Sequence, residues 1–324
     1  MNINRRALVA LILASAGVSA IAAEPPWPTK PVRLIVGFAP GGGTDIVARL
    51  IAQKLTETLG QSFVVDNRPG ATGMIGAKTV ATSPADGYTL LFGHVNSQAI
   101  APAISERPQY DPDKDFASVA YIGFVANVLV INANSPDKSV ADLVARAKAS
   151  PQGLVFASPG IGSTNHLAGE MLRLQTGAKL VHVPYKGSGP AAVDLMAGLV
   201  DMNFDVTASV MPYLKSGRVR ALAVTSKERD PQLPDVPTLR ELGYKSFDIT
   251  NWYGVEAPAG TPTAIVNFLN ERIEHVLAMP DVVARFAELG VGRIPMTPAQ
   301  FAEFNRAESA KYRDFAKQSG VRFE

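Results

Sequence analysis

The chain has 324 residues, 47% of them hydrophobic, a formal net charge of +2 and no cysteine. Without disulfides it must rely on an ordinary hydrophobic core, which a chain of this length can build. No basic stripe suggests nucleic acid as a partner, and four histidines without any cysteine argue against a structural zinc site. We therefore expect neither a metal nor a cofactor.

The N-terminus is typical of an export signal. Arg5 and Arg6 form a short basic region, residues 7–20 are apolar but too few to span a membrane, and residues 20–22 are those of a cleavage site. We expect residues 1–22 to be removed and the mature protein to be periplasmic. A buried N-terminal helix is the alternative interpretation.

Hydrophobic residues then follow strand and helix periodicities in turn. The first part predicts strand 32–38, a helix from about 45 to 59, strand 63–66, helix 70–82 and strand 88–93. The middle predicts strand 128–132, helix 139–149, strand 154–157, helix 163–175, strand 180–185, helix 189–199 and strands 202–206 and 219–226. The last part predicts an extended segment 251–258 and helices 262–277, 284–289 and 298–318. This alternation predicts an α/β fold with mainly parallel sheets flanked by helices.

The length allows two domains of ordinary size. Extended stretches near residues 123–126 and 248–253 would let the chain cross between them twice, as a two-strand hinge. We predict one lobe from residues 25–124 and 249–324, and a second lobe from residues 125–248. A single large α/β domain with one sheet is the alternative.

Three consecutive glycines follow the first predicted strand and precede its helix. Uncovered N–H groups at this turn and the positive end of the helix make an anion site without a charged side chain. A turn without function would also explain the glycines, and Asp45 can be read as a ligand contact or as a residue that complements the helix dipole. The candidate contacts are Phe38, Ala39, Pro40, Gly41, Gly42, Gly43, Thr44 and Asp45.

A second glycine-containing turn joins strand 154–157 to the next helix. Ser163 or Thr164 can cap that helix, which by itself would explain the turn. The functional interpretation adds free N–H groups and hydroxyls that point at an anion, with His166 either as a polar contact or as a buried histidine. The candidate contacts are Gly160, Gly162, Ser163, Thr164, Asn165 and His166.

Polar residues also stand at the ends of other predicted strands, namely His94, Asn96, Ser97, Tyr185 and Asp205. Tyr185 could wall a pocket or simply pack, and Asp205 could hold a ligand amine or cap the following helix. The carboxyl ends of strands are where open α/β sheets bind ligands, so the shared position of these residues predicts a binding site there.

The sequence contains no Gly-x-Ser-x-Gly elbow and no His-Glu-x-x-His motif. Thr44 and Asp45 follow the glycine run where a nucleotide P-loop has Lys and Ser or Thr, and Ile46 stands where a dinucleotide fingerprint has Gly or Ala. An exported hydrolase would need a pair such as Ser163 and His166, which lacks an evident orienting carboxylate. We therefore predict a binding protein rather than an enzyme.

Taken in order, these motifs resemble the solute-binding receptors of the tripartite tricarboxylate transporter class, also called Bug proteins. The matching stretches are residues 27–28, 30–33, 38–45, 65–71, 83–90, 162–170, 183–187, 205, 215–217, 220–225 and 234–238. The resemblance implies a two-lobed fold of the periplasmic-binding-protein type, with the ligand between the lobes. It also implies a pincer on one carboxylate, formed by residues 38–44 and 160–166, with Tyr185 and Asp205 beside it.

The resemblance implies as ligand a small carboxylate: an amino acid, a di- or tricarboxylate, or an aromatic acid. It implies as partners the membrane subunits of a tripartite tricarboxylate-type transporter, and a monomeric receptor; a receptor that acts in signalling is the alternative. Residues that could contact the far end of the ligand are Phe38, His94, Asn96, Ser97, Val206 and Thr207. Because Val206 is apolar where the family often has a polar residue, an apolar or aromatic acid stays open.

Overall fold

The computed structural model describes residues 27–185 and 188–320. The predicted export signal and Lys186, in one of the matching stretches, lie outside the described residues. The elements before the central strand are β1 (Val32–Val36), α2 (Gly43–Leu59), β2 (Phe63–Asn67), η1 (Ala71–Gly73), α3 (Met74–Ala81), β3 (Thr89–His94), η2 (Asn96–Ile100) and α4 (Ala101–Ile104). The elements that follow are β4 (Phe116–Asn132), α5 (Val140–Ala149), β5 (Leu154–Ser158), α6 (Thr164–Thr176), β6 (Leu180–Pro184), α7 (Ser188–Ala197), β7 (Met202–Val206), α8 (Thr207–Lys215) and β8 (Val219–Val224). The chain continues with β9 (Thr250–Pro258), α9 (Thr263–Leu277), α10 (Pro280–Leu289) and α11 (Pro298–Ser319).

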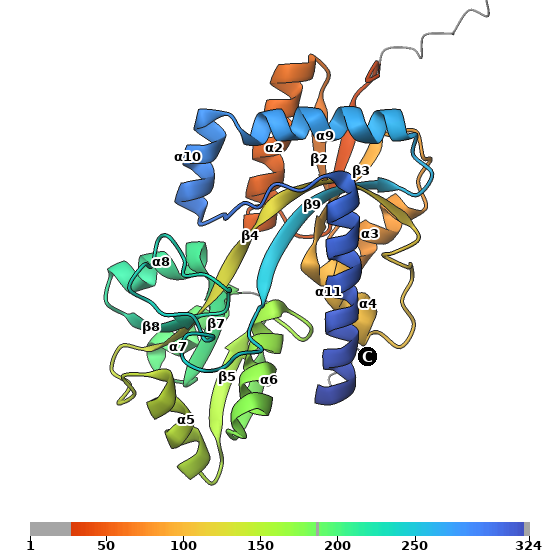
Figure 1. Ribbon diagram of the computed structural model, residues 1–324. Helices are drawn as coiled ribbons and strands as arrows, with labels where there is room; N and C mark the ends of the chain where they lie inside the picture. The colour runs from red at the N-terminus through yellow and green to blue at the C-terminus, as the bar shows by residue number, and fades with distance from the viewer. Residues whose placement is uncertain (1–26, 186–187, 321–324) are drawn as a thin grey trace, which may run out of the picture.

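The strands form two lobes that share the long strand β4 (Figure 1). In the first lobe, β1 lies between β2 and β3 in parallel, and β9 pairs antiparallel with β3 and with the first part of β4. In the second lobe, β5 pairs in parallel with β6 and β7, and the last part of β4 pairs antiparallel with β7 and β8. Each lobe therefore has a parallel centre, and the strands that connect the lobes supply the antiparallel pairs. The lobe boundaries given above stay a prediction.

Most predicted elements are present, with shifted ends. The helix predicted from residue 70 begins as an α-helix only at Met74, because Thr72 has φ 54° inside the short turn η1. Strand β4 is much longer than the predicted 128–132: residues 119–126 are also apolar, and they form most of its first half by pairing with β9. The π-turn η2 has no counterpart in the predicted elements. As expected, Ser139 and Ser163 cap their helices through their side chains.

Helix α11 lies against β4 (Figure 1), and its side chains reach one face of β9. The indole N–H of Trp252 donates to Glu308 Oε2 at 3.0 Å, and Asn305 Nδ2 donates to Glu256 Oε1 at 2.7 Å. Alternate residues of β9 point the other way, and Tyr253 belongs to the core of the first lobe. One strand thus faces α11 on one side and the first lobe's core on the other.

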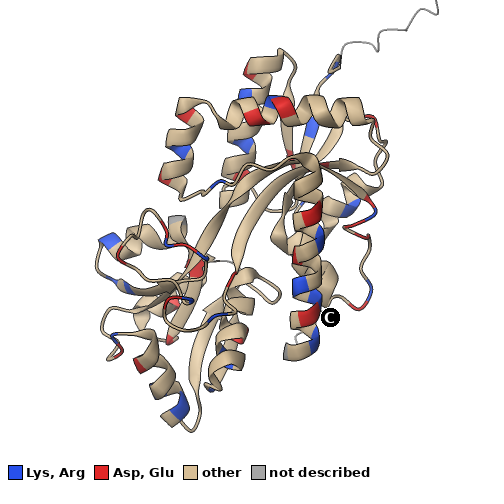
Figure 2. Cartoon of the chain, viewed as in Figure 1, with Lys and Arg blue, Asp and Glu red and all other residues tan. Residues whose placement is uncertain are grey.

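Charged side chains of both signs are interspersed over the helices, while β4 and β9 are mostly uncharged on the face seen in Figure 2. No helix in the two described segments, 27–185 and 188–320, has the length and apolar character needed to cross a membrane.

Gly254 provides a test of the packing between β9 and α11. A Cβ at this position would overlap the ring of Phe301, so we expect Gly254→Ala to lower the free energy of unfolding by about 1–3 kcal/mol. Chemical denaturation of both proteins measures the difference. Gly189→Ala is the matched control, because a Cβ there meets nothing within 4 Å and should leave stability unchanged or slightly higher. Equal stability of the two variants would contradict the packing described here.

Candidate functional site

The first glycine turn leaves the start of α2 without a side-chain cap. Gly42 is the N-cap residue, with φ −79° and ψ 166°, and it has no side chain that could accept a hydrogen bond from the first-turn N–H groups. Residues 39–43 are exposed, whereas Thr44 and Asp45 are buried. The first-turn N–H groups of a helix have no intrahelical partner, so this exposed end can accept an anion, as the sequence predicts.

Asp45 is held by partners of its own lobe. Its carboxylate accepts hydrogen bonds from Gly41 N, Arg49 Nε and Asn67 Nδ2, each at 2.9 Å. Burial alone would raise the pKa of Asp45, but these hydrogen bonds together hold the pKa below its ordinary value. The geometry therefore favours the structural interpretation of Asp45: an ionised side chain that fixes the glycine turn.

The second turn is built in a similar way at the start of α6. Ser163 Oγ donates to Gly160 O at 2.7 Å and accepts from His166 N at 3.2 Å. Gly162, with φ 76°, donates its N–H to Nδ1 of His166 at 3.2 Å. Ser163 Oγ and Nδ1 of His166 are both engaged with the backbone of the turn and not with each other, so Ser163 and His166 do not form the nucleophile–base pair that a hydrolase would need.

The two helix starts meet the same face of β9. Thr164 Oγ1, at the first position of α6, donates to Asn251 Oδ1 at 2.7 Å. A Cβ placed on Gly43, at the first position of α2, would lie 3.8 Å from the Tyr253 hydroxyl. Asn251 and Tyr253 are two residues apart on one strand, so their side chains leave the same face about 7 Å apart. The positive ends of a helix from each lobe therefore converge on one short stretch of β9.

His94 contributes an aromatic group beside the first turn. Its ring lies 5.0 Å from that of Phe38 and 5.4 Å from that of Tyr253, measured between centroids. Burial lowers the pKa of His94 to about 3, and Nδ1 accepts the N–H of Asn96 at 3.0 Å, so the imidazole is neutral. The buried Oδ1 of Asn96 has no partner among the described residues, and Ser97 Oγ donates to His94 O at 3.1 Å. This corner therefore offers one free buried acceptor.

The remaining predicted contacts are tied to other parts of the second lobe. Asn165 Nδ2 donates to Phe204 O at 2.6 Å. Tyr185 Oη donates to Asp194 at 2.6 Å, which together with burial raises the pKa of Tyr185 to about 12. Asp205 accepts from Ser188 Oγ at 2.9 Å and from its neighbouring amide. Tyr185 and Asp205 thus contact α7.

Val206 and Thr207 lie at the junction of the lobes. Val206 packs against the core of the first lobe, and buried Thr207 donates to Asp230. These contacts connect neither side chain to the glycine turns.

Two residues that the sequence did not single out belong to this region. Tyr253 lies against the first turn, and its only sequence signal was its place in the predicted crossing segment 248–253. His182 stacks on His166 at a centroid distance of 4.0 Å, and nothing in its local sequence indicated that contact.

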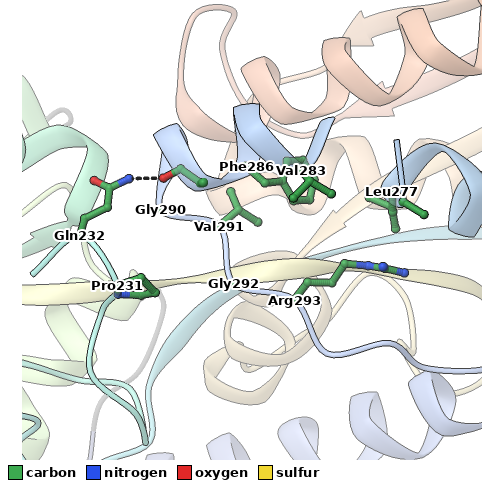
Figure 3. A pocket seen from close by; sticks show the side chains of 11 residues that line it. Pro231, Gln232, Leu277, Val283, Phe286, Gly290, Val291, Gly292 and Arg293 are labelled. Carbon is green, nitrogen blue, oxygen red and sulfur yellow. Dashed lines mark hydrogen bonds between the residues drawn. The ribbon is translucent and has the colours of Figure 1, made fainter. Parts of the chain in front are cut away.

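A separate cavity of about 450 Å³ lies between the loop at Pro231 and Gln232 and the segment from α9 to Arg293 (Figure 3). It contains none of the predicted contact residues. Gln232 Nε2 donates there to Ala287 O at 2.5 Å, at the end of α10. Within residues 27–185 and 188–320, no group of three or more acidic or histidine side chains is placed to hold a metal ion.

Comparison with known proteins agrees with this architecture. The sequence model described as tripartite tricarboxylate transporter family receptor matches residues 47–321. The chain belongs to this family.

Individual relatives of this receptor match along nearly its whole length. Protein BugT of Bordetella pertussis is 38% identical over 327 residues, which cover all of both chains. The structure of Rpa4515 from R. palustris with adipate has 39% identity and a TM-score of 0.84, covering 92% of this chain and 99% of that one. The structure of the periplasmic binding protein BugD has 35% identity and a TM-score of 0.81, covering 92% of this chain and all of that one. The protein is therefore a Bug-type solute-binding receptor with two lobes, and not an enzyme.

Asp205 of this receptor gives a pH prediction. Burial raises the pKa of Asp205 to about 6 from an ordinary value of 3.8. The stability that the neutral carboxyl contributes is therefore fully present below pH 3.8 and is lost as the pH rises through 6. Asp205→Asn cannot ionise. We expect the stability of the variant relative to wild type to increase from pH 4 to pH 7, by up to about 3 kcal/mol. Denaturation at both pH values measures it; a difference independent of pH would contradict the raised pKa.

Proposed function

We propose that the protein captures a small carboxylate between its lobes, in the periplasm and as a monomer, and presents it to the membrane subunits of a tripartite tricarboxylate-type transporter. One observation carries the proposal: the starts of α2 and α6, one from each lobe, meet the same face of β9 at Tyr253 and Asn251. Two sets of helix N–H groups can then hold the two sides of one carboxylate.

The ligand class is inferred from two relatives. Neutral His94 and the ring of Phe38 bring no charge to the first turn, so a carboxylate there would be held by backbone N–H groups. Rpa4515 was solved with adipate, and MatC of Rhodopseudomonas palustris, 34% identical with a TM-score of 0.79, was solved with malate. We therefore place four- to six-carbon dicarboxylates first among the acids to test, ahead of amino, aromatic and tricarboxylic acids.

Closure would take place about the two strands that pass between the lobes. Strands β4 and β9 pair with each other from Phe116 and Pro258 as far as Ala126 and Thr250, so a small change in their twist at that end would rotate one lobe against the other. A carboxylate that contacts both helix starts binds the closed arrangement better and shifts the population toward it.

A thermal-shift screen tests the proposal. The mature chain is unfolded and refolded to remove bound molecules, then heated with adipate, malate, succinate, citrate, glutamate and benzoate. An acid that binds only the folded state raises the melting temperature. At a concentration 100 times Kd it adds about 2.7 kcal/mol to the free energy of unfolding. We expect a dicarboxylate to give the largest shift. No shift with any of these acids would contradict the proposed ligand class, and uptake that is unchanged in cells lacking the protein would contradict the transport role.

Gly42 tests the role of the first turn directly. Its backbone angles are open to any residue, and a Cβ would meet only Ala39 O, at 3.8 Å. Gly42→Val should therefore fold normally but cover the N–H groups at the start of α2, and we expect it to weaken binding of the best acid at least tenfold, about 1.4 kcal/mol. Titration calorimetry measures the affinity. Unchanged affinity in a folded Gly42→Val protein would show that the turn does not contact the ligand.

A further inference from the structure

His182 lies on β6, behind the second glycine turn. Its ring contacts the rings of Phe156 and His166, with centroid distances of 4.8 Å and 4.0 Å and angles between ring planes of 28° and 24°, and those two rings are themselves 6.2 Å apart. Its Nε2 atom lies 2.7 Å from Ser158 Oγ, at the end of the neighbouring strand β5. The imidazole therefore joins the strand below the turn to the helix that begins after it.

Ser158 links His182 to the backbone of the second glycine turn. Ser158 Oγ accepts from Gly160 N at 3.1 Å and lies 3.0 Å from Gly160 O, within reach of its hydroxyl proton. The bond between Ser158 Oγ and Nε2 of His182 can run in either direction, because the neutral imidazole has two tautomers. Burial lowers the pKa of His182 to about 4, which agrees with a neutral ring at neutral pH. His182, Ser158 and Gly160 thus form a chain of hydrogen bonds that ends on the backbone of one glycine.

The same stack fixes His166. Because Nδ1 of His166 accepts from Gly162 N at 3.2 Å, its hydrogen is on Nε2. Burial, and then the neighbouring His182, lowers the pKa of His166 to about 3, so this ring is neutral as well. The two stacked histidines hold Gly160 through one ring and Gly162 through the other. Residue 161, which lies between these two glycines, is the exposed tip of the turn.

We propose that His182 is a positioning residue for ligand binding, which acts through Ser158 to set the conformation of residues 160–162 at the start of α6. The inference rests on the proposed function, because it takes this turn as one side of the carboxylate site. It assigns a role to a residue outside the predicted ligand contacts, which reaches the start of α6 by stacking on His166. A preorganised turn loses less conformational freedom on binding, which is why the chain of hydrogen bonds should affect affinity.

The test uses two substitutions at His182. His182→Phe keeps a planar ring in the stack but cannot form the hydrogen bond to Ser158, whereas His182→Gln gives up the ring and places an amide group near the position of Nε2. Ser158→Ala removes the same chain without changing the stack, and His275→Phe, at an exposed position on α9, is the control. Hydrogen exchange of residues 158–166 is followed by mass spectrometry in the ligand-free protein, and adipate and malate are titrated by calorimetry.

We expect faster exchange of residues 158–166 in His182→Phe and in Ser158→Ala, and affinity for the acid that wild type binds weakened roughly 5- to 10-fold, the loss of one neutral hydrogen bond. His182→Gln should restore most of both, and His275→Phe should change neither. Unchanged exchange in both His182→Phe and Ser158→Ala would overturn the positioning role. Faster exchange with unchanged affinity would also overturn it. If wild type binds neither acid, it is the ligand class of the proposed function that fails, and the exchange experiment still decides whether His182 holds the turn.

Discussion

The two faces of strand β9 determine where the groups of the candidate site lie. On one face, Trp252 and Glu256 are hydrogen-bonded to α11, and Gly254 leaves room for the ring of Phe301. On the other face, Asn251 and Tyr253 contact the starts of a helix from each lobe. Because side chains of a strand alternate, a shift of register by one residue would exchange these faces and separate the helix starts. The C-terminal helix α11 is far from the glycine turns in sequence, yet its packing keeps β9 in the register that brings them together.

Both glycine turns are held by side chains of their own lobe. In the first lobe, the Asp45 carboxylate accepts the N–H of Gly41 and is itself paired with Arg49. In the second lobe, Ser158 and His166 accept the N–H groups of Gly160 and Gly162. These bonds use some of the N–H groups that the sequence suggested were free, and the Ser163 cap uses the N–H of His166; the first-turn amides of α2, and those of Thr164 and Asn165 in α6, are left for an anion. Rigid backbone donors of this kind can stabilise a carboxylate without an arginine or lysine in contact with it.

The sequence predicted the local parts of this site well. Glycines between a strand and a helix, the Ser163 cap and the ends of β7 all depend on residues close in the chain, and the structure has them where expected. Less local features were missed or shortened. The apolar run at residues 119–126, of which only 123–126 was predicted to be extended, is part of β4 and pairs with β9. Tyr253 and His182 reach the glycine turns across the fold from segments with no binding motif of their own.

By itself the sequence determined the succession of strands and helices, the two glycine turns at helix starts and the family resemblance, because periodicity, glycine conformation and helix capping act over a few residues. Only the tertiary structure decided which polar groups are already engaged. Asp45 and Asp205 are both acidic residues next to a helix start, yet one is held ionised by an arginine and two amide donors while burial raises the pKa of the other to about 6. Burial and partners far apart in the chain set such differences, since desolvation and hydrogen bonding depend on what the fold places around each group.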